Sequence, residues 1–189
     1  MMHFPIKDKP KFDFTDIPVV FEYENVISKT MAQSLIDEAT SHSGWHRRGS
    51  KTSYTSASFT TTLLSDTTHP IYKLLDDLWK QFTDEHKFNI DFIEPYEIKE
   101  YRAGDKFDNH YDWHGRIHEP LDRKMNLTLQ LSDSNDYEGG DLVVINKQTI
   151  KNLGSAIFFP AHYMHRVTEI TQGTRYCLIG HAWGNVDKG

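Results

Sequence analysis

Three residues in the second half of the sequence could together bind one metal ion. His110 and Asp112 stand two positions apart, and His165 follows after a gap of about fifty residues. Two imidazoles and one carboxylate form the facial triad that holds Fe(II) on one face and leaves the opposite face open. Residues i and i+2 of a strand point to the same side, so His110 and Asp112 can share an ion while another strand supplies His165. The spacing therefore predicts a site for a single iron ion.

Arg175 is the second chemically informative residue, because it follows His165 by ten positions. Ten residues are enough for one strand, a turn and the start of the next antiparallel strand, so we expect Arg175 on the strand beside His165. A guanidinium group can grip a carboxylate through two parallel hydrogen bonds. An arginine beside a metal site predicts a bound acid that also chelates the metal.

Seven short segments of this half of the chain occur in a recognisable order. They are Tyr101–Gly104, His110–Asp112, Leu127–Asp133, Asp136–Leu142, Phe158–Pro160, His165–Thr168 and Gly173–Tyr176. The ordered set resembles the Fe(II)/2-oxoglutarate-dependent oxygenases, and within them the prolyl 4-hydroxylase-like branch. The resemblance favours His165 over the nearby His162 as the second histidine ligand, because Arg-Val-Thr follows the ligand in the family's pattern.

The resemblance implies a set of cofactors and the residues that hold them. Fe(II), 2-oxoglutarate as cosubstrate and O2 are expected, with ascorbate as a further cofactor. The triad would ligate iron, and Arg175 would bind the distal carboxylate of 2-oxoglutarate. Tyr101, Thr128 and Gln130 would complete the cosubstrate pocket.

A wider group of residues is expected near the substrate. Alternation along a strand places Cys177, Ile179 and His181 on the face that carries Arg175. Members of the family often have Trp at the position of His181. The substrate-side residues that we predict are Tyr54, Trp113, His114, Arg116, His181 and Trp183.

The function implied by the resemblance is hydroxylation of an aliphatic C–H bond by a dioxygenase, with release of succinate and CO2. A proline-containing peptide or protein is the expected substrate, and a free amino acid or other small molecule is the alternative. Nucleobase demethylases typically carry a second arginine six residues after the first, where this chain has His181. The net charge of −6 also disfavours a nucleic-acid partner. A non-catalytic metal-binding β-barrel sensor is a third alternative, disfavoured because the triad and Arg175 are both intact.

Two amphipathic helices are expected to support the site. The first covers residues 29–40 and is capped by Ser28, and the second runs from Thr67 or Thr68 to about His86. Apolar residues recur every three or four positions in both segments, which is typical of a helix with one face packed against other structure.

Short strands follow the helices. In residues 124–132 the apolar and polar side chains alternate, as in a strand with one packed face and one pocket-lining face. The apolar members are Met125, Leu127, Leu129 and Leu131, and the polar ones are Asn126, Thr128 and Gln130. The pattern predicts a mainly β fold with supporting helices, a β-sandwich or jelly roll. The resemblance implies a double-stranded β-helix with N-terminal helices on one sheet. We expect one domain, with an arm, helices and flap in residues 1–91 and the core in 92–189.

Residues 42–66 are rich in Ser and Thr and carry three basic side chains. One interpretation is a solvated loop with short strands, and the other is a flap at residues 49–63 that folds over substrate.

Composition narrows the class of protein. A chain of 189 residues with 38% hydrophobic residues suits one globular domain. The single cysteine, Cys177, excludes an internal disulfide and agrees with a reducing, cytoplasmic compartment. Residues 1–14 have no apolar run, so neither a signal peptide nor a membrane span is expected. A monomer is compatible with the sequence.

Overall fold

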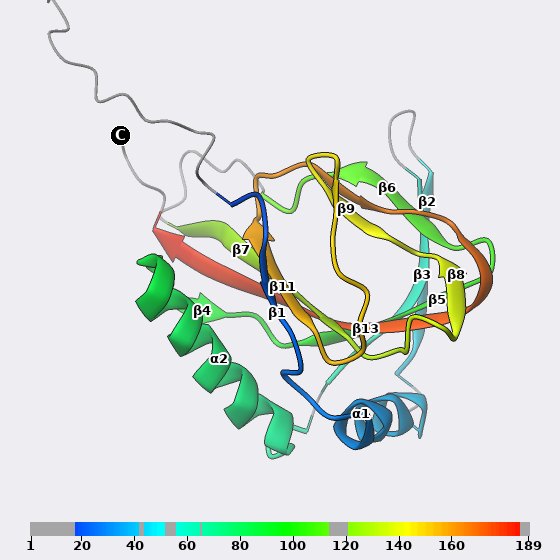
Figure 1. Cartoon of the computed structure of the whole chain (residues 1–189), viewed down its shortest axis with the longest axis horizontal. Coiled ribbons are helices and arrows are strands. Elements are labelled where there is room, and N and C mark those ends of the chain that lie inside the picture. The colour runs from blue at the N-terminus through cyan, green and yellow to red at the C-terminus, as the bar shows by residue number, and fades with distance from the viewer. Residues whose placement is uncertain (1–17, 42–43, 52–55, 65, 114–120, 186–189) are drawn as a thin grey trace, which may run out of the picture.

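One antiparallel sheet curls through most of the molecule, and two helices cover its outer side (Figure 1). The computed structural model describes residues 18–41, 44–51, 56–64, 66–113 and 121–185. The predicted mainly β architecture with helical support is confirmed. Among the described residues, no helix has the length and apolar character needed to cross a membrane.

The helices are α1 (Lys29–Ser41) and α2 (Pro70–His86). The strands, in chain order, are β1 (Phe21–Tyr23), β2 (His46–Lys51), β3 (Ser56–Leu63), β4 (Phe92–Ile93), β5 (Glu97–Arg102), β6 (Lys106–His110), β7 (Leu121–Gln130), β8 (Tyr137–Gly139), β9 (Leu142–Val144), β10 (Lys147–Gln148), β11 (Ala156–Pro160), β12 (His165–Val167) and β13 (Ile170–Asn185).

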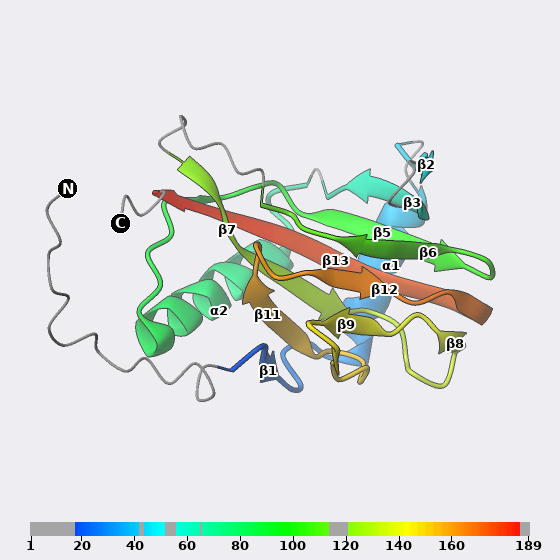
Figure 2. The same ribbon diagram turned by 90° about the horizontal axis from the view of Figure 1, so that it is seen from above.

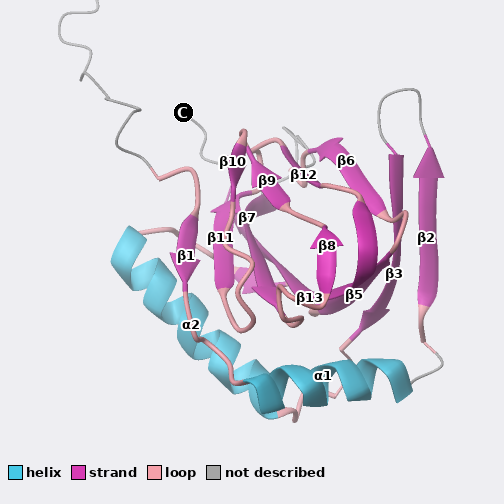
Figure 3. Ribbon diagram, turned by 45° about the vertical axis from the view of Figure 1, so that its right-hand side comes forward, coloured by secondary structure: helices cyan, strands magenta, loops and turns pink. Residues whose placement is uncertain are grey.

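The order of neighbouring strands explains how an interior forms. The main path runs β1-β11-β7-β13-β5-β3-β6-β12-β9-β10, with β2 added beside β3 and with β4 and β8 beside β13. The sheet curls until β6, β9 and β12 lie opposite β5, β7 and β13 (Figure 3), and residues from both walls line one cavity. The long strand β13 crosses almost the whole molecule (Figure 2) and belongs to the wall nearer the helices.

The outer core lies between this wall and the helices. The helices contribute Leu35, Ile71, Leu75, Trp79 and Phe82, and the sheet contributes Ile98, Met125, Leu127, Leu129, Phe158 and Leu178. The stripe predicted on the second helix is therefore the buried face of α2. Its rings pack closely, since Phe82 stacks on Phe158 with ring centroids 4.4 Å apart. The burial of these apolar side chains between α2 and the sheet stabilises the position of the helix.

The start of α2 differs from the prediction. The helix begins at Pro70, and His69 is its cap, because Nδ1 of His69 accepts a hydrogen bond of 3.2 Å from the N–H of Ile71. Thr68 does not cap the helix, since its N–H and hydroxyl both donate to Asp66 Oδ1. A proline in the first turn needs no hydrogen-bond partner, so Pro70 suits this position.

Within the Ser/Thr-rich segment the expected short strands are present, because residues 46–51 and 56–63 form the antiparallel pair β2 and β3. β3 also pairs with β5 and β6 along its other edge. The flap at residues 49–63 stays a prediction. The tip between the two strands, residues 52–55 with the predicted substrate residue Tyr54, lies outside the described residues.

Candidate active site

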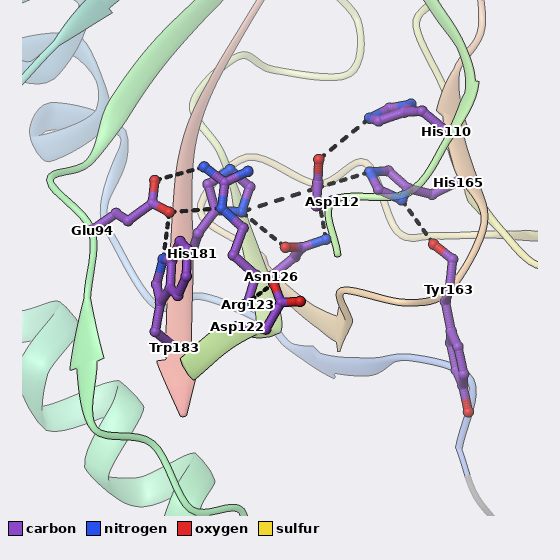
Figure 4. Close-up of polar contacts among 10 residues, drawn as sticks. All are labelled: Glu94, His110, Asp112, Asp122, Arg123, Asn126, Tyr163, His165, His181 and Trp183. Carbon is purple, nitrogen blue, oxygen red and sulfur yellow. Dashed lines mark hydrogen bonds and ion pairs between the residues drawn. The ribbon is translucent and has the colours of Figure 1, made fainter. Parts of the chain in front are cut away.

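A His-Asp-His cluster lies inside the curled sheet (Figure 4). His110 is the last residue of β6, Asp112 follows in a bend, and His165 is the first residue of β12. Asp112 Oδ1 is 3.7 Å from His110 Nε2, and Asp112 Oδ2 is 3.2 Å from His165 Nε2. One ligand atom from each residue lies within 4.8 Å of the other two. The three predicted metal ligands are thus brought together.

Backbone pairing explains two of the positions, and a loop contact explains the third. His110 and His165 are register partners in the β6–β12 pair. Asp112 is not in the strand, contrary to the alternation argument. Instead, the N–H groups of Asp112 and Trp113 both donate to the carbonyl oxygen of Ala161 at 3.1 Å, which fixes the bend.

The two histidine rings present the same nitrogen to the centre of the cluster. His110 Nδ1 lies 2.8 Å from the carbonyl oxygen of Asp108, and His165 Nδ1 lies 3.0 Å from that of Tyr163. A carbonyl oxygen only accepts, so both Nδ1 atoms carry the proton and donate. Both Nε2 lone pairs therefore face Asp112, as is usual for metal-binding histidines held by backbone carbonyls.

The charge states also suit a metal ion. Burial lowers the pKa of His110 to about 4, with the neighbouring His165 acting in the same direction. Burial by itself would raise the pKa of Asp112, but the three histidines around it, His165 first and then His181 and His110, hold it well below its usual range when they carry protons. A metal ion would take the place of the proton on His165 Nε2. A neutral imidazole and an ionised carboxylate are the forms that bind a divalent cation, so this donor set fits Fe(II).

A chain of polar contacts orients the carboxylate of Asp112 (Figure 4). Asn126 Nδ2 donates to Asp112 Oδ2 at 2.8 Å, and His181 Nδ1 lies 2.9 Å from Asn126 Oδ1. Asn126 and His181 are register partners in the β7–β13 pair. His181 therefore lies in the cavity, as predicted, and its hydrogen bond orients the amide of Asn126.

Trp183 does not reach the cavity, which corrects its prediction as a substrate residue. A register shift between Ala182 and Trp183 interrupts the alternation of β13. The indole of Trp183 stacks on Phe92 with centroids 5.5 Å apart, and its Nε1 donates to Glu94 Oε1 at 2.5 Å.

Arg175 is buried across the cavity from the histidines, with 1% of its surface exposed. Its Nη2 donates to Gln130 Oε1 at 3.0 Å, while Nε and Nη1 have no hydrogen-bond partner. No carboxylate among the described residues pairs with it. A buried cation without a counterion is strongly disfavoured, so this guanidinium is suited to receive an anion.

The surroundings of Arg175 correct two predictions. β13 does not pair with the strand of His165. It pairs with β5, where Arg175 is the register partner of Tyr101, so Arg175 faces the cluster from the opposite wall. Gln130 does not line the cavity, because its side chain accepts from Arg175 and donates to the carbonyl oxygen of Ile150. Tyr101 and Thr128 do line it.

Gly139 and Gly140 form a tight turn between β8 and β9. Gly139 and Gly140 have φ of 75° and 63°, a region that side chains disfavour. A Cβ on Gly140 would lie 3.1 Å from Arg175 Cδ. The step thus lets the turn between β8 and β9 close over the arginine.

Besides the residues that were assigned a role, the cavity is lined by Lys99, Phe107, Asn126, Leu142, Phe159, Val167, Cys177 and Ile179. Alternation had already placed Asn126 on the face of Thr128 and Cys177 and Ile179 on the face of Arg175, and it places Lys99 on the face of Tyr101. The other four are apolar, and nothing in their sequence context distinguishes them from core residues.

The remaining predicted residues lie outside the cavity or outside the described chain. Trp113 is 47% exposed beside the cluster, and His114 and Arg116 fall in residues 114–120, which the structure does not describe. His162 lies in a separate surface depression with Tyr163 and Arg166, so it is not part of the cluster.

The sequence is similar to a known family and to several known hydroxylases. Residues 96–183 match the model of the 2OG-Fe(II) oxygenase superfamily. A PKHD-type hydroxylase from Idiomarina loihiensis is 31% identical over 87 residues, which are 44% of this chain and 39% of that protein. The chain therefore spans about two-fifths of the length of that relative. A PKHD-type hydroxylase from Pseudomonas aeruginosa is 26% identical over 85% of this chain and 74% of its own length.

The fold has counterparts among solved structures. A viral collagen prolyl hydroxylase from Paramecium Bursaria Chlorella virus-1 superposes with a TM-score of 0.73 at 15% identity, covering 89% of this chain and 97% of that one. A prolyl-4-hydroxylase from Pseudomonas putida gives 0.68 at 13% identity, covering 87% and 91%. The predicted jelly-roll fold is confirmed.

Proposed function

We propose that the chain is a member of the 2OG-Fe(II) oxygenase superfamily, whose model its residues 96–183 match, and that it is an Fe(II)- and 2-oxoglutarate-dependent dioxygenase that hydroxylates an aliphatic C–H bond. The observation that carries the proposal is the pairing of two features in one cavity. The His-Asp-His cluster lies on one wall, and a buried arginine with two unpaired nitrogen atoms lies on the other.

Each feature has a role in this proposal. His110, Asp112 and His165 hold the metal through two Nε2 atoms and a carboxylate. Arg175 binds the distal carboxylate of 2-oxoglutarate with the donors that have no protein partner. Tyr101, whose ring lies 5.5 Å from the guanidinium carbon of Arg175, borders the same site.

The cavity also controls water. Phe107, Leu142, Phe159, Val167 and Ile179 give it apolar walls between the polar groups. When bound, Fe(II) with O2 and 2-oxoglutarate supplies the oxidising power for C–H hydroxylation and converts 2-oxoglutarate to succinate and CO2. The contribution of the protein is to hold the reactants in position and to keep bulk water away from them.

For the substrate we propose a proline-containing peptide. Its support is the resemblance to prolyl hydroxylases in motifs and fold, including a Trichoplax adhaerens prolyl hydroxylase whose structure holds a peptide fragment (TM-score 0.67, 12% identity). A free amino acid is the second candidate. Lys99, which lines the cavity, favours a substrate with a carboxylate. Ascorbate would keep the iron reduced.

Succinate formation tests the proposed reaction. Purified protein supplied with Fe(II), ascorbate and 2-oxoglutarate should form succinate even without substrate, at a low rate that a metal chelator abolishes. Mass spectrometry of proline peptides from the same mixtures should then show a gain of one oxygen atom. A correctly folded protein that neither binds 2-oxoglutarate nor forms succinate would contradict the proposal.

A further inference from the structure

Lys99 is a second cation in the cavity, and the proposed cosubstrate site does not use it. The residue lies in the middle of the sheet, where its backbone is the register partner of Cys177 on β13 and of Thr61 on β3. Pairing on both edges fixes the direction of its side chain, which lines the cavity together with Tyr101 and His110.

Two aromatic rings hold the ammonium group at this position. Lys99 Nζ lies 4.7 Å from the ring centroid of Phe59 and 5.8 Å from that of Phe107. Phe107 in turn stacks on His110, with centroids 3.5 Å apart and planes 9° from parallel. The ammonium is therefore close to the reaction centre.

No carboxylate neutralises Lys99 within the part of the chain that the structure describes. Its neighbours are the two rings, and the structure gives it no ion pair. The comparison with Lys151 is informative, because Lys151 Nζ also lies over a ring, 4.6 Å from the centroid of Tyr137. Lys151 has a counterion, Asp141, at 3.0 Å. Two lysines thus stack on aromatic rings, and the unpaired one faces the cavity.

The charges of the proposed complex leave Lys99 in excess. The two positive charges of Fe(II) and the one of Arg175 equal the single negative charge of Asp112 and the two of 2-oxoglutarate. Asp112 is the one carboxylate among the described residues that line the cavity. A further cation in a partly desolvated site favours an anionic ligand.

We propose that Lys99 binds a carboxylate of the substrate and so selects acidic substrates over their neutral counterparts. This inference rests on the proposed function and adds a substrate class to it. The carboxylate could be the α-carboxylate of a free amino acid or the side chain of Asp or Glu beside the oxidised residue of a peptide. Both present the same group to the ammonium, so the experiment has to separate them.

The test compares acids with their amides. One arm uses free amino acids and the corresponding amino acid amides. The other uses capped tripeptides with a central proline, flanked by Asp or Glu or by Asn or Gln. Substrate-stimulated succinate formation is measured for the wild type, Lys99→Met, Lys99→Arg and the matched control Lys151→Met. Calorimetry then measures binding of the preferred probe to anaerobic protein loaded with Mn(II) and 2-oxoglutarate.

We expect acidic probes of one arm to exceed their amides by about 10- to 100-fold in both kcat/KM and affinity, as for a charge-assisted hydrogen bond. Lys99→Met should reduce this ratio to near one, Lys99→Arg should restore much of it, and Lys151→Met should keep it. The Kd of 2-oxoglutarate should stay within about twofold of the wild type in each variant, and succinate formation by the wild type tests the proposed function separately.

Three results would overturn the assignment. They are equal response to acids and amides, no response to any acidic probe, and an undiminished preference in Lys99→Met. A large rise in the Kd of 2-oxoglutarate in Lys99→Met would equally exclude it, because Lys99 would then belong to the cosubstrate site.

Discussion

In residues 125–130 of β7 both faces of the strand are closed to solvent, but they are built from different side chains. Met125, Leu127 and Leu129 are fully buried against the helices. On the other face Asn126 and Gln130 are 1% exposed and Thr128 is 4% exposed, so burial alone does not distinguish the two faces. Burying polar groups costs free energy, so the polar residues on this face of β7 are better explained by a role in the site than by a contribution to stability.

The contacts made by each face agree with this division. The helix-facing side of the sheet makes ring and aliphatic contacts: Phe158 of β11, the register partner of Leu127, packs edge-on against Trp79 at 4.7 Å. On the other face of β7, Asn126 donates to Asp112 and Gln130 accepts from Arg175, and Arg175 keeps two unpaired donors. Changes on the first face should therefore act on folding, and changes on the second should act on ligands.

The largest effect is expected from loss of a metal ligand. Asp112→Ala removes the only charged donor of the cluster, so Mn(II) binding measured by calorimetry and Fe(II)-dependent succinate formation should both become undetectable. His165→Ala should do the same. His162→Ala is the control, since His162 lies outside the cluster. Full activity in His165→Ala together with loss in His162→Ala would show that the ligands have been misassigned.

The next effect concerns the outer core. Phe158→Ala removes a ring that packs against Tyr23, Trp79 and Phe82, so unfolding should become easier by about 3–5 kcal/mol. Urea denaturation measures this. The Kd of 2-oxoglutarate for the folded Mn(II)-loaded variant should change less than about threefold. A much larger change in Kd would break the proposed separation of the two faces.

Arg175→Ala should show the opposite pattern. Loss of a charge-assisted contact in a buried pocket costs on the order of 2–4 kcal/mol, which is roughly 30- to 1000-fold in the Kd of 2-oxoglutarate. Metal affinity should hardly change, and Arg175→Lys should recover part of the loss as a point charge without the guanidinium fork. The Kd of 2-oxoglutarate is measured by calorimetry with anaerobic Mn(II)-loaded protein. An unchanged Kd in a folded Arg175→Ala protein would refute the assignment.

The smallest effect is a difference in acid sensitivity. Burial lowers the pKa values of His110 and His181 to about 4. Unfolded histidines take up protons below about pH 6.5, so the unfolded state binds more protons than the folded state between about pH 6.5 and 4. The stability of the metal-free protein should therefore be complete above this window and fall as the pH drops through it, by up to about 3 kcal/mol for each histidine.

Urea denaturation at several pH values measures this slope. His181→Gln should flatten it, and His86→Gln should leave it unchanged, because His86 lies outside the cavity at the end of α2. A free energy of unfolding that did not vary between about pH 6.5 and 4 would contradict the lowered pKa values of His110 and His181.

The sequence predicted the local features well. Alternation in residues 124–132 identified both faces of β7, and the periodicity of residues 70–86 identified the buried face of α2. Spacing could not predict which strands meet across the curled sheet. For this reason Arg175 was expected beside His165, although β13 lies in the opposite wall. Composition allowed short strands in the Ser/Thr-rich segment but could not show that one of them, β3, is paired on both edges.

That strand makes residues 96–183 dependent on the chain before them. Thr60–Leu63 of β3 pair with β5, and Ala57–Ser58 pair with β6, so β3 joins the wall that carries Tyr101 to the strand that carries His110. A fragment that begins at residue 96 would leave both strands with an open edge, which favours aggregation over folding. A protein cut in the connection after β3 should instead regain its site only when the two pieces reassociate. Any shortened form prepared for crystallisation or binding assays has to retain β3.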